Sequence, residues 1–396
     1  MELRKIANAL GIDTYPHAFN DIYKRSVSNS EPACDLALID TLEAQYGIFG
    51  EFYDLVRDTA AQINEDPAVS LWVKVTSRYA LEGDAEQAFE IPAPVLNGNP
   101  KNDLLLLYVL LPQIPGSIEN YKGKEFGPEV MEDVLEAYKI SLRILQGRMG
   151  RPCIDKAHYN WLLLFTKALI FKTEGFQFER NKLPKMAIWL RNRNSGQFVP
   201  VMTGGIFHAS GVQRVGSLGY TDEKGAFEPV FSEDAENYYG HGAFDNVVDA
   251  QSRTFSKQEW ECVARPGDNC LCIHIPRGAD ISREATLGAC QSAMRIVRER
   301  FSEHACCLVF CNSWLLNPTL KQLQGPDSRI TQFMECFSKY PNRDPAGKAV
   351  FGFVFGKQYG DPAQLPEDTS LQRKLKKLYL DGGCLHSYSG AIYVEE

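Results

Sequence analysis

A strand, a glycine turn and a helix follow one another in CLCIHIPRGADISREATLGAC, residues 270–290. The first seven residues present no strongly polar face, which is typical of a strand buried inside a sheet. Beyond Gly278, Ser282 is a suitable helix N-cap. Because the first amides of a helix lack intrahelical partners and the helix dipole makes that end partly positive, such a turn can bind a phosphate, with Arg277 adding charge. The alternative is an ordinary connecting turn.

Acid–base candidates precede this segment. Glu259 and Glu261 flank Trp260 and share one face of an expected strand, so either could act as a general base, directly or through water. The loop NYYGHG offers Tyr239 as a proton donor and His241, whose imidazole titrates in the useful pH range. The alternatives are a solvated pair of glutamates and a packed aromatic loop with a hydrogen-bonded histidine.

Cys270, Cys272 and His274 lie on one strand face and raise the question of a metal site. Ligands two residues apart on an extended strand are about 6.5–7 Å apart at Cα, which is awkward for closing on one ion. No CxxC pair accompanies them. We therefore expect packing side chains and no metal.

A second apolar run, ACCLVFC, ends at Cys311 and is followed by Asn312 and Ser313. Ser313 could donate a hydrogen bond to a reacting group or cap a helix. Cys311 paired with His241 or His304 would form a thiol nucleophile, an alternative that only spatial proximity could support.

The totals limit the choice of function. A chain of 396 residues predicts two domains or three, and a formal net charge of −8 argues against nucleic acid as a partner. The longest aliphatic run, 104–111, is far shorter than the roughly 20 residues that cross a bilayer. With 11 cysteines and no secretory signal at the N-terminus, we expect reduced thiols and a cytoplasmic location.

The apolar periodicity is helical from residue 1 to about 174. After Gly175 it changes to short β-type runs: FQFER, MAIWLRNRNSGQFVPVM with a hairpin turn at RNSGQ, EWECVA, NCLCIHIP, HACCLVFC and VFGFVFG. EDTSLQRKLKKLYLDGG predicts a helix before a last strand, AIYV. The order of strand, helix and strand around residues 270–311 predicts a parallel crossover.

The series EDAENYYGHG, EWECVARPGDNCLCIHIPRG, CNSWLLNPTLKQL, SRITQFMECF and LPEDTSLQRKLKKLYLDGG resembles a bacterial family of two-domain acyltransferases. Members of this family carry a helical N-acyltransferase-type domain followed by a GNAT-like domain. The likeness covers most of the chain and is strongest from about residue 150. It implies an α+β protein with a helical domain at 1–153 and a GNAT-like mixed-sheet domain at 154–396.

In GNAT folds a central strand, a turn and a helix hold the pyrophosphate of acyl-coenzyme A (acyl-CoA), and the pantetheine arm lies where two parallel strands splay apart. By this resemblance CIHIPRGADIS is that strand and turn. The usual turn has its glycine further from the basic residue, whereas Arg277 directly precedes Gly278 here; Asp280 follows, and Pro276 lacks an amide N–H. The implied coenzyme contacts are Ile275, Arg277, Gly278, Ala279, Asp280, Ile281, Ser282, Cys311 and Asn312.

We therefore expect a cytoplasmic acyltransferase that moves an acyl group from acyl-CoA to a small amine or hydroxyl acceptor, without a metal. The expected acid–base and hydrogen-bonding residues are Glu259, Glu261, His241, Tyr239 and Ser313. One alternative is a non-catalytic ligand-binding or interaction protein on the same scaffold, and a third option is a cysteine-dependent hydrolase. The acceptor, the acyl length and the oligomeric state are not set by the sequence.

Overall fold

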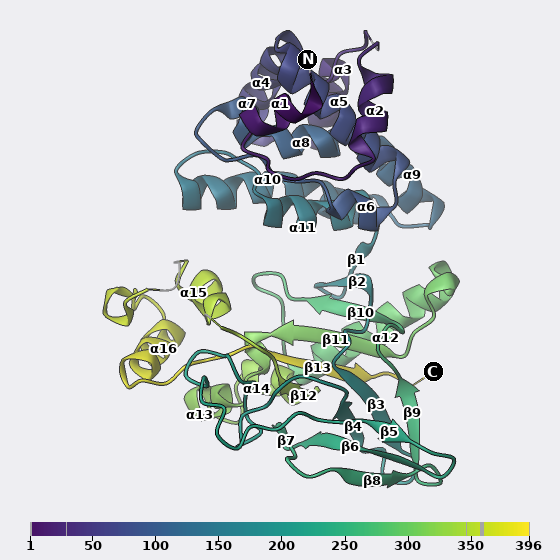
Figure 1. The fold of residues 1–396 in the computed structure, drawn as a ribbon, viewed down its shortest axis with the longest axis vertical. Helices are drawn as coiled ribbons and strands as arrows, with labels where there is room; N and C mark the ends of the chain where they lie inside the picture. Colours follow the sequence, from purple (N-terminus) through teal and green to yellow (C-terminus); the bar gives the residue numbers. More distant parts are fainter. Residues whose placement is uncertain (1, 29, 346, 357–359, 396) are drawn as a thin grey trace. The chain divides into compact units, whose positions relative to one another are not determined.

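A computed structural model describes residues 2–28, 30–345, 347–356 and 360–395 (Figure 1). The chain divides into two compact units, Met1–Phe171 and Lys172–Glu396. The first unit is helical and the second is built on two sheets, which confirms the expected α+β class. The boundary expected between residues 153 and 154 comes from a family resemblance rather than from contacts, and it stays a prediction.

Side-chain caps begin several helices of the first unit. Asp35, Asp66, Asp84 and Asp155 each accept hydrogen bonds from amides in the following first turn. The α-helices of this unit are α1 (Leu3–Ala9), α2 (Phe19–Ser26), α3 (Leu36–Tyr46), α4 (Tyr53–Glu65), α5 (Pro67–Glu82), α6 (Ala85–Phe89), α7 (Pro100–Asp103), α8 (Leu105–Leu110), α9 (Ile114–Gly123), α10 (Pro128–Met149) and α11 (Lys156–Thr166).

The aliphatic run at 104–111 forms the centre of the helical unit. Every residue of α8 is buried, so this helix is covered on all sides. Phe19 contacts Trp72 and Tyr79 edge to face beside it, at ring distances of 5.8 and 4.9 Å. A search of the described residues finds no helix with the length and hydrophobicity to cross a membrane.

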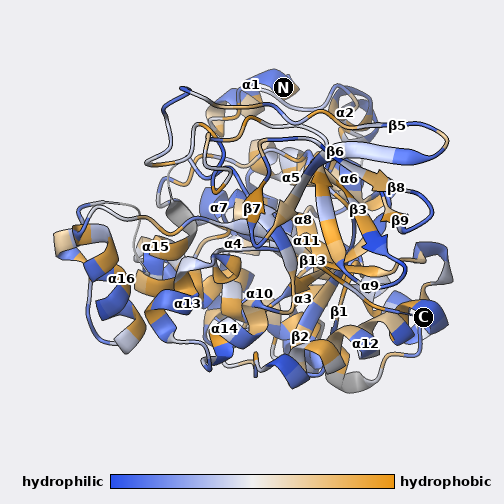
Figure 2. Cartoon of the chain, turned by 90° about the horizontal axis from the view of Figure 1, so that it is seen from below, coloured by the Kyte–Doolittle hydropathy of each residue, from blue (hydrophilic) through white to orange (hydrophobic). Residues whose placement is uncertain are grey.

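Two sheets organise the second unit, and hydrophobic residues colour much of their strands orange in Figure 2. The β10 sheet has the order β1-β2-β10-β11-β13-β12, and the β3 sheet has the order β5-β6-β4-β3-β9 with β7 and β8 paired to β6. The strands are β1 (Ile170–Thr173), β2 (Phe176–Lys182), β3 (Ala187–Asn192), β4 (Phe198–Met202), β5 (Ser232–Glu233), β6 (Asn237–Phe244), β7 (Val247–Val248), β8 (Arg253–Ser256), β9 (Trp260–Ala264), β10 (Asn269–His274), β11 (Leu308–Ser313), β12 (Ser338–Pro341) and β13 (Tyr388–Tyr393). The helices are α12 (Arg283–Arg300), α13 (Thr319–Gln324), α14 (Arg329–Met334), α15 (Lys348–Phe355) and α16 (Ser370–Leu380).

The predicted crossover is confirmed, because β10 leads through α12 to β11 and the two strands pair in parallel. Their ladder holds the pairs Leu271–Val309 and Cys272–Phe310. Ser282 caps α12 by accepting a hydrogen bond from the amide of Ala285. The expected hairpin between β3 and β4, the helix α16 and the last strand β13 are also confirmed.

The expected strand VFGFVFG is wrong, since residues 350–355 belong to helix α15. Val350, Phe351 and Phe355 are buried in one cluster, whereas Phe353 is 81% exposed. This spacing of buried positions is that of a helix, and a short apolar run does not distinguish helix from strand by composition.

Candidate functional site

The carboxyl ends of β11 and β12 lie level with each other at one edge of the β10 sheet. Ser313 at the end of β11 and Pro341 at the end of β12 both pair with Tyr388 of β13. Since β10 runs parallel to β11, its end at His274 lies at the same edge. We call this the carboxyl edge; the turn predicted to bind phosphate follows it directly.

That turn, residues 275–282, has the backbone shape that glycine permits. Gly278 has φ +87°, and a Cβ added at this position would meet only open space. Both Gly278 and Arg277 are exposed. Three neighbouring amides are already bonded: Ala279 to the Pro276 carbonyl, Ser282 to the Asp280 carboxylate and Arg283 to the Gln332 side chain.

The amides of Gly278, Asp280 and Ile281 have no hydrogen-bond partner among the described residues. The Asp280 carboxylate is turned to the start of α12, where Oδ1 accepts from the Ser282 amide at 3.0 Å and lies 3.6 Å from Arg329. The hydrogen bond from Ser282 is the main cause that lowers the pKa of Asp280, and Arg329 adds to it. The turn therefore combines bonded and open amides.

Polar side chains stand where β10 and β11 stop pairing. His274 and Asn312 each lie two residues beyond the last pair, Cys272–Phe310, so they occupy matching positions on one face. The Nε2 of His274 lies 2.8 Å from the Glu179 carboxylate of β2, and Asn312 accepts a hydrogen bond of 3.1 Å from Asn342. The sequence analysis named Asn312 but neither Glu179 nor Asn342.

Cys311 lies on the opposite face of β11 from Asn312 and is buried. Burial raises its pKa to about 12, so the thiol is neutral at physiological pH. The histidines suggested as its base bond elsewhere: His304 Nε2 lies 2.9 Å from the Cys270 carbonyl, and His241 Nδ1 lies 2.9 Å from the Asp249 carbonyl. The structure does not bring a thiol–imidazole pair together here.

Ser313 acts as a cap. Its Oγ accepts a hydrogen bond of 3.1 Å from the amide of Leu315, at the start of a short 3-10 helix, Trp314–Leu316. A metal centre has no support in the described ranges, which contain no group of three or more His, Cys, Asp or Glu able to hold an ion.

Glu261 lies at the other end of β11 from the turn. Its carboxylate is 2.6 Å from Arg193 and 3.5 Å from Arg191. The guanidinium of Arg191 stacks over Tyr393, which pairs with Leu308, the first residue of β11. Glu259 is exposed. The structure therefore separates both glutamates from the carboxyl edge.

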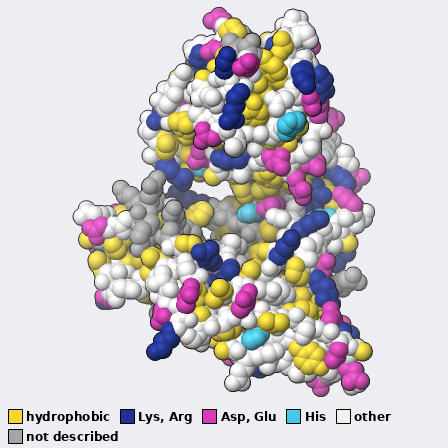
Figure 3. Space-filling view, viewed as in Figure 1, with side chains coloured by type: hydrophobic (Ala, Val, Ile, Leu, Met, Phe, Trp, Pro, Cys, Tyr) yellow, Lys and Arg dark blue, Asp and Glu magenta, His cyan; other side chains and the backbone are white. Residues whose placement is uncertain are grey.

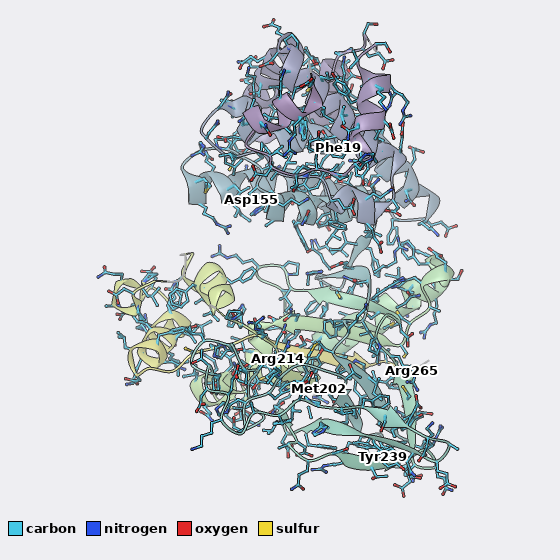
Figure 4. The ribbon with its side chains drawn as sticks, in the orientation of Figure 1. Phe19, Asp155, Met202, Arg214, Tyr239 and Arg265 are labelled. Carbon is cyan, nitrogen blue, oxygen red and sulfur yellow. The ribbon has the colours of Figure 1, made fainter. Side chains whose placement is uncertain are left out.

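Tyr239 and His241 are on β6 in the other sheet. The Tyr239 hydroxyl donates to Asp234 at 2.8 Å, which is the main cause that raises the pKa of the tyrosine. Figure 4 shows Tyr239 well apart from Arg214, a residue near the carboxyl edge. The imidazole of His241 stacks on Phe227 at 5.7 Å, and its Nδ1 donates to the Asp249 carbonyl, which leaves Nε2 as the basic nitrogen.

A buried histidine near the carboxyl edge was missed by the sequence analysis. His386 is 2% exposed, and neither ring nitrogen has a hydrogen-bond partner in the described part of the chain. Burial lowers its pKa, a shift that Asp344 and the Leu218 carbonyl oppose. Tyr220 contacts His386 edge to face at 5.8 Å and His208 at 5.4 Å. No local sequence motif predicts that His386 lies beside Tyr220 and His208, because these residues are distant in sequence.

A cavity of about 360 Å³ runs along α12 from its first turn. Its lining includes the charged residues Glu174, Glu284 and Arg295 and the small residues Ala285 and Gly288. On the face shown in Figure 3, acidic and basic side chains are interspersed.

The parallel pair, the glycine turn and the capped helix define a GNAT-like mixed-sheet domain. A family model described as the GNAT-like C-terminal domain matches residues 177–392, and the chain belongs to this family. The search of curated proteins found no match.

Solved structures over the full length of both chains are similar to this fold. They include an acyltransferase in complex with decanoyl-CoA (TM-score 0.68, 15% identity) and a mutant acyltransferase in complex with octanoyl-CoA (TM-score 0.67, 15% identity). A third is an acyltransferase in complex with decanoyl-CoA and teicoplanin (TM-score 0.63, 15% identity). All three cover 100% of this chain and of their own.

Proposed function

We propose that the protein is an acyltransferase that moves an acyl group from acyl-CoA to a small amine or hydroxyl acceptor. The observation that carries the proposal is the end of the parallel ladder after Cys272–Phe310, directly before a turn with open amides at Gly278, Asp280 and Ile281. Family membership and the acyl-CoA complexes of similar folds support it.

The turn would hold the diphosphate of the coenzyme through these amides, with Arg277 adding positive charge. The other residues of the turn that we propose to contact the coenzyme are Ile275, Ala279 and Ser282. The cavity along α12 begins at Glu284, beside the turn, and offers room for more of the coenzyme. No metal is needed for this chemistry.

The thioester carbonyl would lie between His274 and Asn312, where the strands have parted. The imidazole of His274, whose Nε2 lies 2.8 Å from the Glu179 carboxylate, would accept the proton from the attacking amine or hydroxyl. The Asn312 side chain would donate a hydrogen bond to the developing oxyanion. When the tetrahedral arrangement collapses, the C–S bond breaks and the proton goes to the thiolate.

Glu259, Glu261, His241, Tyr239 and Ser313 stay predictions for acid–base or hydrogen-bonding roles. Their positions favour them less than the His274–Glu179 pair, which stands at the carboxyl edge. Cys311 would contact the coenzyme only through packing, because its thiol is buried on the opposite face.

The acyl length and location can be proposed from further observations. Similar folds bind octanoyl-CoA and decanoyl-CoA, so we include medium-chain donors beside acetyl-CoA. All 11 cysteines have free thiols, which supports a reducing, cytoplasmic location.

A non-catalytic binding protein is the second candidate. It is favoured by the Asp280 carboxylate and the Gln332 side chain, which occupy the amides of Ser282 and Arg283 at the place of the expected diphosphate. This candidate predicts no turnover and weak or absent binding of any acyl-CoA.

Calorimetric titration with acetyl-, octanoyl- and decanoyl-CoA distinguishes the two. Gly278→Trp should weaken binding about a hundredfold, since the side chain fills the space that the diphosphate needs. The matched control is Gly267→Trp, because Gly267 has φ +88° and open surroundings but lies before the other end of β10. The proposal fails if no donor binds, or if both variants weaken binding equally.

A further inference from the structure

Two arginines near the carboxyl edge, Arg214 and Arg343, have no carboxylate partner in the part of the chain that the structure describes. Arg343 follows β12 two residues after its end, and Arg214 lies in the loop after β4. Within the described residues, neither guanidinium makes a hydrogen bond or an ion pair. The Nε of Arg214 is buried as well. Burial lowers the pKa of Arg214, and the positive charge of Arg343 lowers it further, so the two charges lie close enough to repel each other.

Two glycines in the loop after β4 make room for the side chains of Arg214 and Arg343. Gly205 has φ +91°, and a Cβ there would lie 3.0 Å from a terminal nitrogen of Arg214. Gly216 has φ +82°, and a Cβ there would lie 3.1 Å from a terminal nitrogen of Arg343. Glycine at both positions therefore lets the guanidinium groups pack directly against the main chain.

The acidic group next to Arg343 does not neutralise this pair. Oδ1 of Asp344 accepts a hydrogen bond of 2.7 Å from the Gly347 amide, and no ion pair joins Asp344 to either arginine in the described ranges. By contrast, the half-buried Arg265 of the same unit has an acidic partner, since it lies 2.9 Å from Glu233. Two neighbouring guanidinium groups that lack an acidic partner among the described residues are suited to bind a carboxylate or phosphate, whose oxygens can accept hydrogen bonds from arginine.

We propose that Arg214 and Arg343 bind an oxyanion, a carboxylate or a phosphate group, carried by the acceptor. The inference rests on the proposed acyl transfer for the identity of the acceptor. It assigns the substrate class as an amine or hydroxyl compound with a negatively charged group.

The sheet order favours the acceptor over the coenzyme as the source of the anion. β10 and β12 are separated by β11 and β13, so their ends lie three strand spacings, about 14 Å, apart. A diphosphate on the turn after β10 is therefore distant from Arg343, which follows β12. The gap where the ladder ends lies between the two, so a donor on the β10 side and an acceptor on the β12 side would meet at His274 and Asn312.

Anion binding can be measured without knowing the acceptor. Sodium acetate and sodium phosphate would be titrated into the full chain at constant ionic strength, and the melting temperature recorded for wild type, Arg214→Gln, Arg343→Gln and the control Arg265→Gln. We expect a saturable rise in wild type and in Arg265→Gln, and loss of most of that rise in the other two. Without added anion, Arg343→Gln should melt at or above the wild-type temperature, because it removes a repulsion and no bond.

Calorimetry with coenzyme A identifies the source of the anion. Coenzyme affinity should stay within about twofold of wild type in Arg214→Gln and Arg343→Gln. A loss of affinity of about tenfold would show that the arginines bind the coenzyme instead of the acceptor, and would overturn the proposal. The proposal would also be overturned if acetate and phosphate did not raise the melting temperature of wild type, or raised it equally in all variants. If acyl-CoA does not bind wild type, the proposed function is refuted. The measured anion binding by Arg214 and Arg343 would still stand, because it does not depend on acyl-CoA.

Discussion

The two ends of strand β11 differ in how their charges are paired. At the amino end, Arg191 bonds Glu261 and Glu395 and stacks over Tyr393. At the carboxyl end, Arg214 and Arg343 repel each other, and neither ring nitrogen of the buried His386 has a hydrogen-bond partner among the described residues. The charge of Arg191 at the first end is paired within the chain, whereas Arg214 and Arg343 at the second end have no acidic partner among the described residues.

Unsatisfied polar groups lower stability, and natural proteins keep them mainly where a ligand binds. The open amides after Gly278 stand at the same carboxyl edge. The comparison therefore favours a structural role for the amino end of β11 and a functional role for its carboxyl end, while the base role expected of Glu261 stays a prediction.

The largest expected effect tests this assignment by turnover. His274→Ala should slow thiol release from acyl-CoA in the presence of acceptor by about 10²–10⁴-fold, since it removes the proposed general base, while coenzyme affinity stays unchanged. Glu179→Gln should shift the pH–rate profile, because the glutamate positions the imidazole. Full activity of His274→Ala together with loss of activity in Glu261→Gln would reverse the assignment.

Stability provides the second contrast. Arg191→Ala should lower the free energy of unfolding by about 1–2 kcal/mol, because it removes two ion pairs and a cation–π contact. Arg214→Met should leave the free energy of unfolding unchanged, since the guanidinium makes no hydrogen bond or ion pair among the described residues. Denaturant titrations measure both, and equal destabilisation would contradict the contrast.

A third prediction concerns pH. Burial lowers the pKa of His386, so as the pH falls below about 6.5 the unfolded chain takes up a proton that the folded chain does not. Stability should therefore fall with pH below 6.5, by at most about 1.4 kcal/mol per unit from this group. His386→Phe should reduce the slope, leaving the part due to His304, whose pKa burial also lowers. An unchanged slope would exclude His386 as its source.

The smallest effect is expected at Tyr239. Its hydroxyl donates a hydrogen bond to Asp234 near the surface. Tyr239→Phe should therefore lower the free energy of unfolding by less than about 0.5 kcal/mol and leave turnover unchanged. If Tyr239 supplies the proton to the thiolate, turnover should instead fall about tenfold or more. Initial rates with octanoyl-CoA distinguish the two.

Local patterns were sufficient to predict most elements of the fold. The run at 270–276 without a strongly polar face, the turn at Gly278 and the Ser282 cap are contiguous, so the strand, turn and helix could be recognised together. Helix α15 was mistaken for a strand because its apolar run is too short to show a period, and only burial of Phe351 and Phe355 reveals it.

The site was predictable only where it is local. The turn could be located from sequence, but Glu179 meets His274 through the register between β2 and β10, and Arg214 meets Arg343 across two distant loops. Ser313 matched both a catalytic and a capping pattern, and the structure shows the cap. Such pairings depend on tertiary contacts that no short stretch of sequence contains.

Hydrogen–deuterium exchange with and without coenzyme A tests the central claim most directly. The account predicts slower exchange of the amides at residues 277–284 on binding and unchanged exchange at residues 257–264, beside the amino end of β11. Protection confined to 257–264, or coenzyme binding without any protection at 277–284, would contradict it.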